Sequence, residues 1–304
     1  MRINALIINI LDRMMSKWEK PFLDSFVKPD NPLFSFDVPY VEDPKERQHF
    51  DLYRADPDKR KGVLLIDIHG GAYVHGWRRN NYPFAQIFRE AGYDVICGDY
   101  RFVKKKDQTD IRTEVQDLIA MLHYITAHEE ELGLQNDVWT FTGDSAGGHF
   151  ALLLGEILFD EKLKKTWGVD MNLPKPACIL INCPAYDFEK MTKGRFTRGG
   201  LRRMFGEIVF DKEFFPNLDP RANLPSLACP LFFSSCRNDS LKENYFSLEA
   251  DCQKLGLEHE KLFLESEDKK VGHVHNIIAV ELPESKQVNQ AMIDFLDAKA
   301  KPSL

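Results

Sequence analysis

The sequence predicts an α/β protein whose central, mostly parallel sheet is flanked by helices. Short, mainly apolar runs such as residues 63–68 and 178–182 are typical of buried strands. They alternate with helical patterns such as residues 109–132, where apolar residues recur every three or four positions. This alternation is the signature of a parallel sheet covered by helices. A chain of 304 residues is long enough for one such unit, so we expect a single domain over residues 1–304.

The elements are expected in a regular order along the chain. Residues 33–41 and 49–53 form a leading antiparallel pair ahead of the parallel strands. Strands are predicted at 63–68, 94–97, 138–142, 178–182, 231–235 and 261–264. Helices are predicted at 109–132, 150–158, 241–255 and 284–299. Gly133 and Gly256 end two of these helices, and Pro283 lies near the first turn of the last one.

Two segments, residues 1–30 and 188–228, fit this alternation poorly and are expected to form a helical cap. The first contains an amphipathic helix, whose apolar positions are Leu6, Ile7, Ile10, Leu11, Met14 and Trp18. We expect this apolar face to pack on the protein's own domain. Docking on a membrane surface is the alternative, which we favour less because the polar face is not strongly basic.

Composition narrows the class of protein. The apolar share of 43% and the charged share of 29% are ordinary for a globular protein, and the net charge of −7 argues against a nucleic-acid partner. The six cysteines form no Cys-x-x-Cys pair, which favours a reduced, cytoplasmic protein. No secretory leader is evident, and no apolar run is long enough to span a bilayer, so stable membrane insertion is not expected.

The segment Gly143-Asp144-Ser145-Ala146-Gly147 is a G-x-S-x-G element between a predicted strand and a predicted helix. In this setting the glycines allow a very tight turn, which exposes the serine hydroxyl at its apex. The amide groups at the start of the following helix favour negative charge nearby. A glycine-rich turn with an incidental serine would give the same letters, but the flanking elements favour Ser145 as a nucleophile.

His69-Gly70-Gly71-Ala72 follows the strand at 63–68. Acyl transfer develops negative charge on a carbonyl oxygen, and backbone N–H groups must already point at that oxygen. We predict the amides of Gly70, Gly71 and Ala146 as these donors. His69 is interpreted as a structural residue of the loop.

The general base and its carboxylate partner should follow Ser145 in the chain. Among the downstream histidines, His259 precedes the last strand, whereas His273 and His275 follow it, where strand C-termini build a site. We favour His273 as the base and interpret His275 as a packing residue. Asp239 follows the strand at 231–235 and is predicted as the acid, although its position would also suit a helix N-cap.

Together these motifs resemble the hormone-sensitive-lipase-like branch of the α/β-hydrolases, which includes acetyl esterases and related carboxylesterases. The resemblance covers roughly residues 30 to 300 and rests on HGGAYVHG (69–76), GDYR (98–101), GDSAGG (143–148), Asp239 and GHVHN (272–276). It implies an eight-stranded, mostly parallel sheet, a cap, no cofactor or metal, and short-to-medium acyl esters as substrates. It also matches His273 to the family's base.

Three departures from the family pattern stand out. Ala72 replaces the third glycine of HGGG, His275 replaces an aromatic residue, and the loop after Arg101 is atypical. Aromatic residues beside the oxyanion motif and in the 188–228 segment could line a substrate pocket or form the core of the cap. They are Tyr73, Trp77, Phe102, Phe205, Phe210, Phe214 and Phe215. The basic run 193–203 could receive an anionic substrate, although a solvated surface is the simpler interpretation.

The function predicted from these residues is hydrolysis of small carboxylic esters through a Ser-His-Asp triad and an acyl-enzyme. An amidase or peptidase using the same triad, and a hydrolase-fold protein that binds a ligand without turnover, are the alternatives. A homodimer formed through an edge strand or the cap is compatible with the sequence.

Overall fold

The computed structural model describes residues 3–135, 138–169 and 172–301, without the side chains at 11, 16, 18–20, 22, 23, 194 and 195. Its centre is an eight-stranded sheet in the order β1-β2-β4-β3-β5-β6-β7-β8. The pairs β1–β2 and β2–β4 are antiparallel and all others are parallel, which confirms the predicted fold class. The strands are β1 (Phe34–Pro39), β2 (His49–Tyr53), β3 (Val63–Ile68), β4 (Asp94–Gly98), β5 (Val138–Asp144), β6 (Pro176–Asn182), β7 (Leu231–Cys236) and β8 (His259–Leu264).

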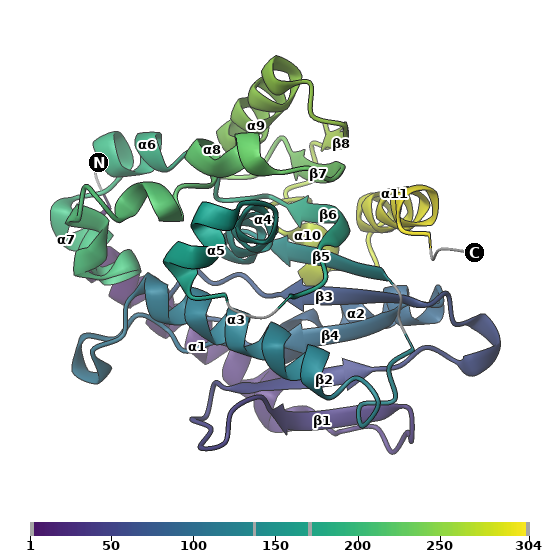
Figure 1. Cartoon of the computed structure of the whole chain (residues 1–304). Coiled ribbons are helices and arrows are strands. Elements are labelled where there is room, and N and C mark those ends of the chain that lie inside the picture. Colours follow the sequence, from purple (N-terminus) through teal and green to yellow (C-terminus); the bar gives the residue numbers. More distant parts are fainter. Residues whose placement is uncertain (1–2, 136–137, 170–171, 302–304) are drawn as a thin grey trace.

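Helices cover both faces of this sheet (Figure 1). Along the central strand β3, Leu64, Ile66 and Ile68 join the core beneath one helical layer, and Val63 and Leu65 join the other core. The first layer contains α3 (Ile111–Ala127), α4 (Ala146–Phe159), α5 (Glu161–Trp167) and α9 (Lys242–Leu255). The second contains α2 (Tyr82–Glu90), α10 (His275–Ile278) and α11 (Pro283–Lys299). Because the strands at the centre are buried on both faces, their sequences are mainly apolar rather than alternating.

Between β6 and β7 the chain forms a set of short helices on one side of the sheet. They are α6 (Phe188–Lys190), a π-helical turn (Met191–Arg195), α7 (Arg198–Phe205), α8 (Pro220–Asn223) and 3₁₀ turns at Glu207–Phe210, Phe215–Leu218 and Leu224–Ser226. Other 3₁₀ turns lie at Pro57–Lys59, Arg78–Asn81 and Lys105–Asp107. The N-terminal helix α1 (Ala5–Ser25) packs against α7 (Figure 1).

Three polar contacts join α1 to this segment. The Thr197 N–H donates to the Ile3 carbonyl over 2.8 Å. The Arg203 guanidinium donates to Asn9 Oδ1 over 2.7 Å and pairs with Asp12 at 3.2 Å. The two segments that fit the alternation poorly therefore lie together in space.

The structure corrects the prediction for the apolar face of α1. Leu6, Ile10 and Met14 are 66%, 47% and 54% exposed, whereas Ile8 on the other side is buried. The reason is that Arg203 binds Asn9 and Asp12, which turns the Ile8 side of the helix towards the protein. The predicted positions Leu11 and Trp18 have side chains outside the described residues.

Several helix boundaries also differ from the prediction. Helix α3 begins after Asp110, whose carboxylate accepts the Arg112 N–H in a capping box, and it ends at Ala127 rather than at Gly133. Helices α2 and α5 are not in the prediction, because nine and seven residues give too few turns for a clear period. All six cysteines are free and buried. None of the helices, over the residues described, combines the length and apolar character that crossing a membrane requires.

Candidate active site

Ser145 lies at the apex of the turn that joins β5 to α4. Its backbone has φ of 53° and ψ of −115°, a conformation that side-chain-bearing residues rarely adopt. A Cβ atom on Gly143 would overlap the Gly147 carbonyl, and one on Gly147 would overlap the Ile68 carbonyl. The Ser145 N–H donates to the Asn182 carbonyl of the neighbouring strand over 2.9 Å. The backbone of this turn is therefore strained, and the hydrogen bond to Asn182 holds it in place. This is the geometry of a turn that exposes a serine hydroxyl at its apex.

A chain of two hydrogen bonds joins Ser145 to Asp239 through His273. The distance between Ser145 Oγ and His273 Nε2 is 3.0 Å, and that between His273 Nδ1 and Asp239 Oδ1 is 2.7 Å. The three residues follow β5, β7 and β8, so the carboxyl ends of three parallel strands bring them together. The structure thus assembles all three residues that the sequence proposes for the triad.

The Asp239 carboxylate is set up to remain ionised. Burial opposes its ionisation, but the hydrogen bond from His273, the Leu241 N–H at 2.8 Å and the Ser235 hydroxyl at 2.7 Å together hold its pKa below the usual value. The alternative role, an N-cap, is not what the structure shows, since α9 begins at Lys242 after Leu241 and no side chain caps it. The Leu241 N–H that Asp239 accepts belongs to the turn before this helix.

The other downstream histidines face away from Ser145. His275 is buried against α11, where its Nδ1 lies 2.9 Å from the Ser285 hydroxyl, and burial lowers its pKa. His259 is the first residue of β8, at the amino end of this strand and so at the end of the sheet away from Ser145. Its Nδ1 lies 2.8 Å from the Leu257 carbonyl. His275 is thus a neutral packing residue, as proposed.

Residues 69–77 contain the predicted oxyanion donors Gly70 and Gly71, and we call them the oxyanion loop after that predicted role. One of these donors is already engaged. The Gly70 N–H donates to Asp144 Oδ1 over 3.0 Å, so it points at the elbow's own carboxylate rather than at a substrate. Gly71 and Ala146 line the cavity next to Ser145, and in the described part of the chain no acceptor binds the Gly71 amide. Gly71 and Ala146 stay predicted donors, and Gly70 becomes an anchor. Ala72 has a φ of 52°, in the left-handed region. The glycine found at this position in the family pattern would adopt this φ without strain.

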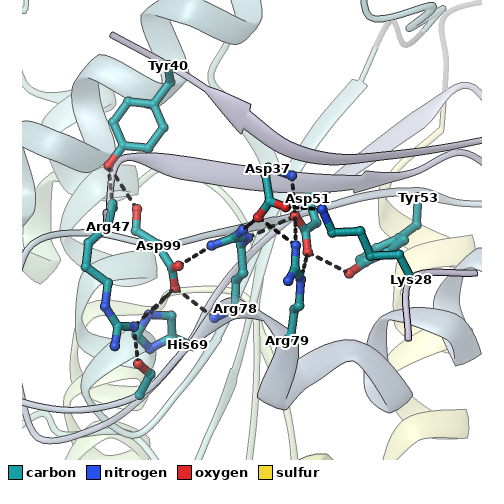
Figure 2. Close-up of polar contacts among 11 residues, drawn as sticks. Lys28, Asp37, Tyr40, Arg47, Asp51, Tyr53, His69, Arg78, Arg79 and Asp99 are labelled. Carbon is teal, nitrogen blue, oxygen red and sulfur yellow. Dashed lines mark hydrogen bonds and ion pairs between the residues drawn. The ribbon is translucent and has the colours of Figure 1, made fainter. Parts of the chain in front are cut away.

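One buried carboxylate holds both ends of the oxyanion loop (Figure 2). Asp99, after β4, accepts the Arg78 backbone N–H over 2.8 Å and pairs with the Arg78 guanidinium. His69 Nε2 lies 3.3 Å from the same carboxylate. The Arg47 guanidinium donates to the Gly76 carbonyl over 2.5 Å and lies 3.8 Å from Asp99. His69 is therefore a structural residue, as predicted.

The same network continues under the neighbouring antiparallel strands (Figure 2). Asp51 on β2 and Asp37 on β1 pair with the guanidinium groups of Arg78 and Arg79. Burial opposes ionisation of Asp37, but Lys28 and Arg79 outweigh it and lower the pKa of Asp37 to about 2. The sequence motifs did not predict this network. The signal present in the sequence is the pair of acidic residues, Asp37 and Asp51, inside strands whose other residues indicate burial.

A cavity of about 690 Å³ opens at Ser145 and His273. Its wall is mainly apolar, and residues 1–30 and the 188–228 segment contribute much of it. These contributions are Ile3 before α1, Ile8 and Met15 on α1, and Met191, Phe196 and Met204. On the opposite side Leu241, Ile277 and Ile278 follow the strands that carry Asp239 and His273. The sequence did not predict Ile8 and Met15 as cavity residues, because they lie outside the apolar face that the helical spacing indicates.

Of the seven aromatic residues proposed for a substrate pocket, the cavity described in the structure includes Tyr73 and not the other six. Phe205 is buried against Tyr73 and Phe188. Three others pack within or beneath the 188–228 segment, and Trp77 and Phe102 lie beside arginine side chains. The ring contacts concerned are Phe214 with Trp167, Phe215 with Phe188, Phe210 with Arg198, Trp77 with Arg79 and Phe102 with Arg47. The cap-core interpretation therefore holds for the phenylalanines of this segment.

The basic run 193–203 is used for structure at the positions whose side chains are described. Lys193 pairs with Glu189, Arg202 with Glu207 and Arg203 with Asp12. None of these three lines the cavity. An anionic substrate therefore finds no support in them.

The described residues include one group of His, Cys and Asp side chains that could hold a metal, formed by Cys183, Asp239 and His273. Their ligand atoms lie within 4.8 Å of one another. Because His273 Nδ1 and Asp239 are already joined at 2.7 Å, the geometry fits proton transfer without further ligands. We assign no metal to this group.

Comparison with known proteins places the chain in a family. The family model BD-FAE matches residues 50–239. Two curated relatives are a probable isoprenylcysteine alpha-carbonyl methylesterase of Oryza sativa, 24% identical over 64% of this chain, and the probable carboxylic ester hydrolase LipM of Mycobacterium tuberculosis, 30% identical over 34%. The chain spans only 45% and 24% of their lengths.

Solved structures agree on the fold over nearly the whole chain. Esterase B from Lactobacillus rhamnosis superposes with a TM-score of 0.82 at 23% identity, covering 96% of this chain and 94% of that one. A bacterial heroin esterase gives a TM-score of 0.68 at 19% identity, covering 99% and 94%. These likenesses confirm the resemblance to the α/β-hydrolases that the motifs indicate. The BD-FAE model matches more than half of the residues of this chain. The chain therefore belongs to the BD-FAE family and has an α/β-hydrolase fold.

Proposed function

We propose that this protein is a serine esterase that hydrolyses carboxylic esters with small, apolar acyl or alcohol groups. The observation that carries the proposal is the continuous hydrogen-bonded chain from Ser145 through His273 to Asp239, which opens on an apolar cavity. The relatives support the reaction class, since their names are those of a methylesterase and a carboxylic ester hydrolase.

In the proposed reaction His273 Nε2 accepts the proton of Ser145 Oγ while that oxygen attacks the ester carbonyl carbon. Asp239 holds the imidazole by its Nδ1–H and stabilises the imidazolium that forms. The tetrahedral oxyanion receives hydrogen bonds from the Gly71 and Ala146 amides. His273 then gives its proton to the leaving alkoxide, which departs as the alcohol. His273 then deprotonates a water, which attacks the acyl-enzyme carbonyl, and returns this proton to Ser145 Oγ as the Oγ–acyl bond breaks and the acid leaves.

The cavity wall supports the choice of substrate. Its volume of about 690 Å³ would enclose an ester with short-to-medium chains, and the methionine, isoleucine and phenylalanine side chains of α1 and the 188–228 segment would contact those chains. We refer to α1 and this segment as the cap. A neighbouring structure fits the proposal, since esterase B is described with a C4 tributyrin phosphonate.

The test joins covalent labelling to turnover. The protein is treated with a fluorophosphonate, and the adduct is located by peptide mapping beside assays on p-nitrophenyl esters of increasing chain length. We expect one adduct, on Ser145, and a loss of turnover of about 10⁴-fold or more in Ser145→Ala. Turnover that survives in Ser145→Ala would refute the assignment. Matched p-nitroanilides separate an esterase from an amidase, and a protein with neither adduct nor turnover would be a ligand-binding member of the fold.

A further inference from the structure

Exposed apolar side chains concentrate on and beside one helix. Of the eight large apolar side chains that are exposed in the described part of the chain, five lie between residues 6 and 27. Leu6, Ile10, Met14 and Met15 belong to α1, and Val27 follows it. Scattered exposed apolar residues are normal, but a concentration of this kind marks a surface that contacts something apolar.

The register of α1 fixes three of these residues on its outer side. Ile8 and Met15 line the cavity, and Asp12 between them pairs with Arg203. Residues at a spacing of four share a helix face, so Leu6, Ile10 and Met14 form one stripe on the side opposite to Ile8 and Asp12. Rotating the helix to bury this stripe would break the contacts with Arg203. The stripe is thus held outward by the fold.

The exposed charges of α1, among the side chains described, are two cations and one anion. Arg13 and Lys17 lie beside the stripe and Asp24 lies near the end of the helix, whereas Asp12 points inward to Arg203. Lys104, Lys105 and Lys106 are exposed on a loop that Arg203 joins to α1 through the Val103 carbonyl, at 3.2 Å, and Asp107 ends this lysine run. The chain as a whole carries a net charge of −7, so the cations here run against its average.

We propose that the outer face of α1 docks on an anionic lipid surface, with Leu6, Ile10 and Met14 at the boundary between headgroups and acyl chains. An apolar stripe flanked by cations is the pattern of helices that lie in such an interface. The proposal stands independently of the proposed esterase activity.

Co-sedimentation with lipid vesicles tests the docking. The intact protein is mixed with vesicles of phosphatidylcholine alone or with about a third phosphatidylglycerol. The triple variant Leu6→Ser, Ile10→Ser and Met14→Ser should lose at least tenfold in partition coefficient. The pair Arg13→Gln and Lys17→Gln should lose most of the preference for phosphatidylglycerol. The matched control is Phe246→Ser with Leu255→Ser, since these α9 residues are each 45% exposed and apolar.

Further readouts separate folding, self-association and catalysis. Circular dichroism and the thermal midpoint confirm that each variant is folded, and hydrolysis of a soluble short ester should be the same in the triple variant. Ser145→Ala should bind vesicles like the parent protein, so failure of the esterase proposal leaves this test intact. Vesicle binding that survives in the triple variant, or that falls equally in the α9 control, overturns the proposal. A parent protein that ignores vesicles overturns it as well, and a dimer that only the triple variant dissociates would identify the stripe as a contact between copies.

Discussion

Replacing Asp67 by asparagine should stabilise the protein, and more so as the pH rises. Asp67 lies on β3 directly behind the site and is fully buried. Its Oδ2 accepts from Asn81 Nδ2 at 2.9 Å and from the Cys97 thiol at 3.4 Å, while its Oδ1 has no partner among the described residues. Burial, and then the nearby Asp144, raise the pKa of Asp67 to about 8. The folded protein therefore holds this acid in its neutral form at pH 7.

The raised pKa has a cost in stability that can be worked out. The ordinary pKa is 3.8, so at pH 7 the unfolded chain has released this proton and the folded chain has not. Stability therefore falls as the pH rises from about 4 to about 8, by about 1.4 kcal/mol per unit, and is level above that range. At pH 7 the difference from an uncharged residue is at most about 4 kcal/mol, and at pH 5 about 2 kcal/mol. An asparagine side chain cannot ionise and keeps an oxygen for Asn81, so Asp67→Asn should gain these amounts.

Urea unfolding at several pH values between about 5 and 8 measures this gain. We compare the parent protein, Asp67→Asn and Asp268→Asn, whose carboxylate is exposed and serves as the control. The gain from Asp67→Asn should grow by about 3 kcal/mol between pH 5 and pH 7, whereas the control should change little. A gain that is constant with pH would show that Asp67 does not titrate differently in the folded state. A loss at every pH would show that its carboxylate is required.

The remaining predictions concern the oxyanion loop and the cap. Asp99→Asn should destabilise the protein by about 3 kcal/mol in urea unfolding, since it leaves buried Arg78 short of one negative partner; an unchanged midpoint would contradict the role of Asp99. Ala72→Gly should raise the free energy of unfolding by about 0.5–1 kcal/mol, because it relieves a φ of 52° at an exposed site; a lower thermal midpoint would argue otherwise. Phe205→Ala should cost about 3–5 kcal/mol yet keep the preference among acyl-chain lengths, because Phe205 is core. Phe196→Ala should instead shift that preference towards longer chains, and identical chain-length profiles for the two variants would count against the cavity assignment.

The sequence predicted the sheet and the grouping of Ser145, His273 and Asp239, because local patterns indicate both. Val63–Ile68 is apolar except for Asp67, and the glycines at 143 and 147 lie where a Cβ would overlap the backbone of a very tight turn at a strand end. His273 and Asp239 were identified from their places after the last two parallel strands, where a site at strand ends must be built.

What the sequence did not predict depends on contacts between distant segments. The outward face of α1 is set by Arg203, nearly two hundred positions away, and not by the period of its own apolar residues. The sequence predicted the Gly70 amide as an oxyanion donor, but in the fold this amide donates to the Asp144 carboxylate. Asp37, Asp51 and Asp99 sit inside or beside strands that the apolar pattern indicates, and only the fold shows that Arg78 and Arg79 meet them there. The periodicity of one segment carries no information on such pairings.

Asp99 binds residues at both ends of the oxyanion loop, which has a consequence for how the substrate preference of this protein could change. With His69 and Arg78 held at one carboxylate, the path of the loop is fixed at its ends, and the residues between them can change without moving the frame. Ala72, which stands in a backbone conformation suited to glycine, shows such a change already tolerated. New substrate preferences could therefore arise from single replacements at the apex of this loop, while the serine elbow and its partners keep their positions.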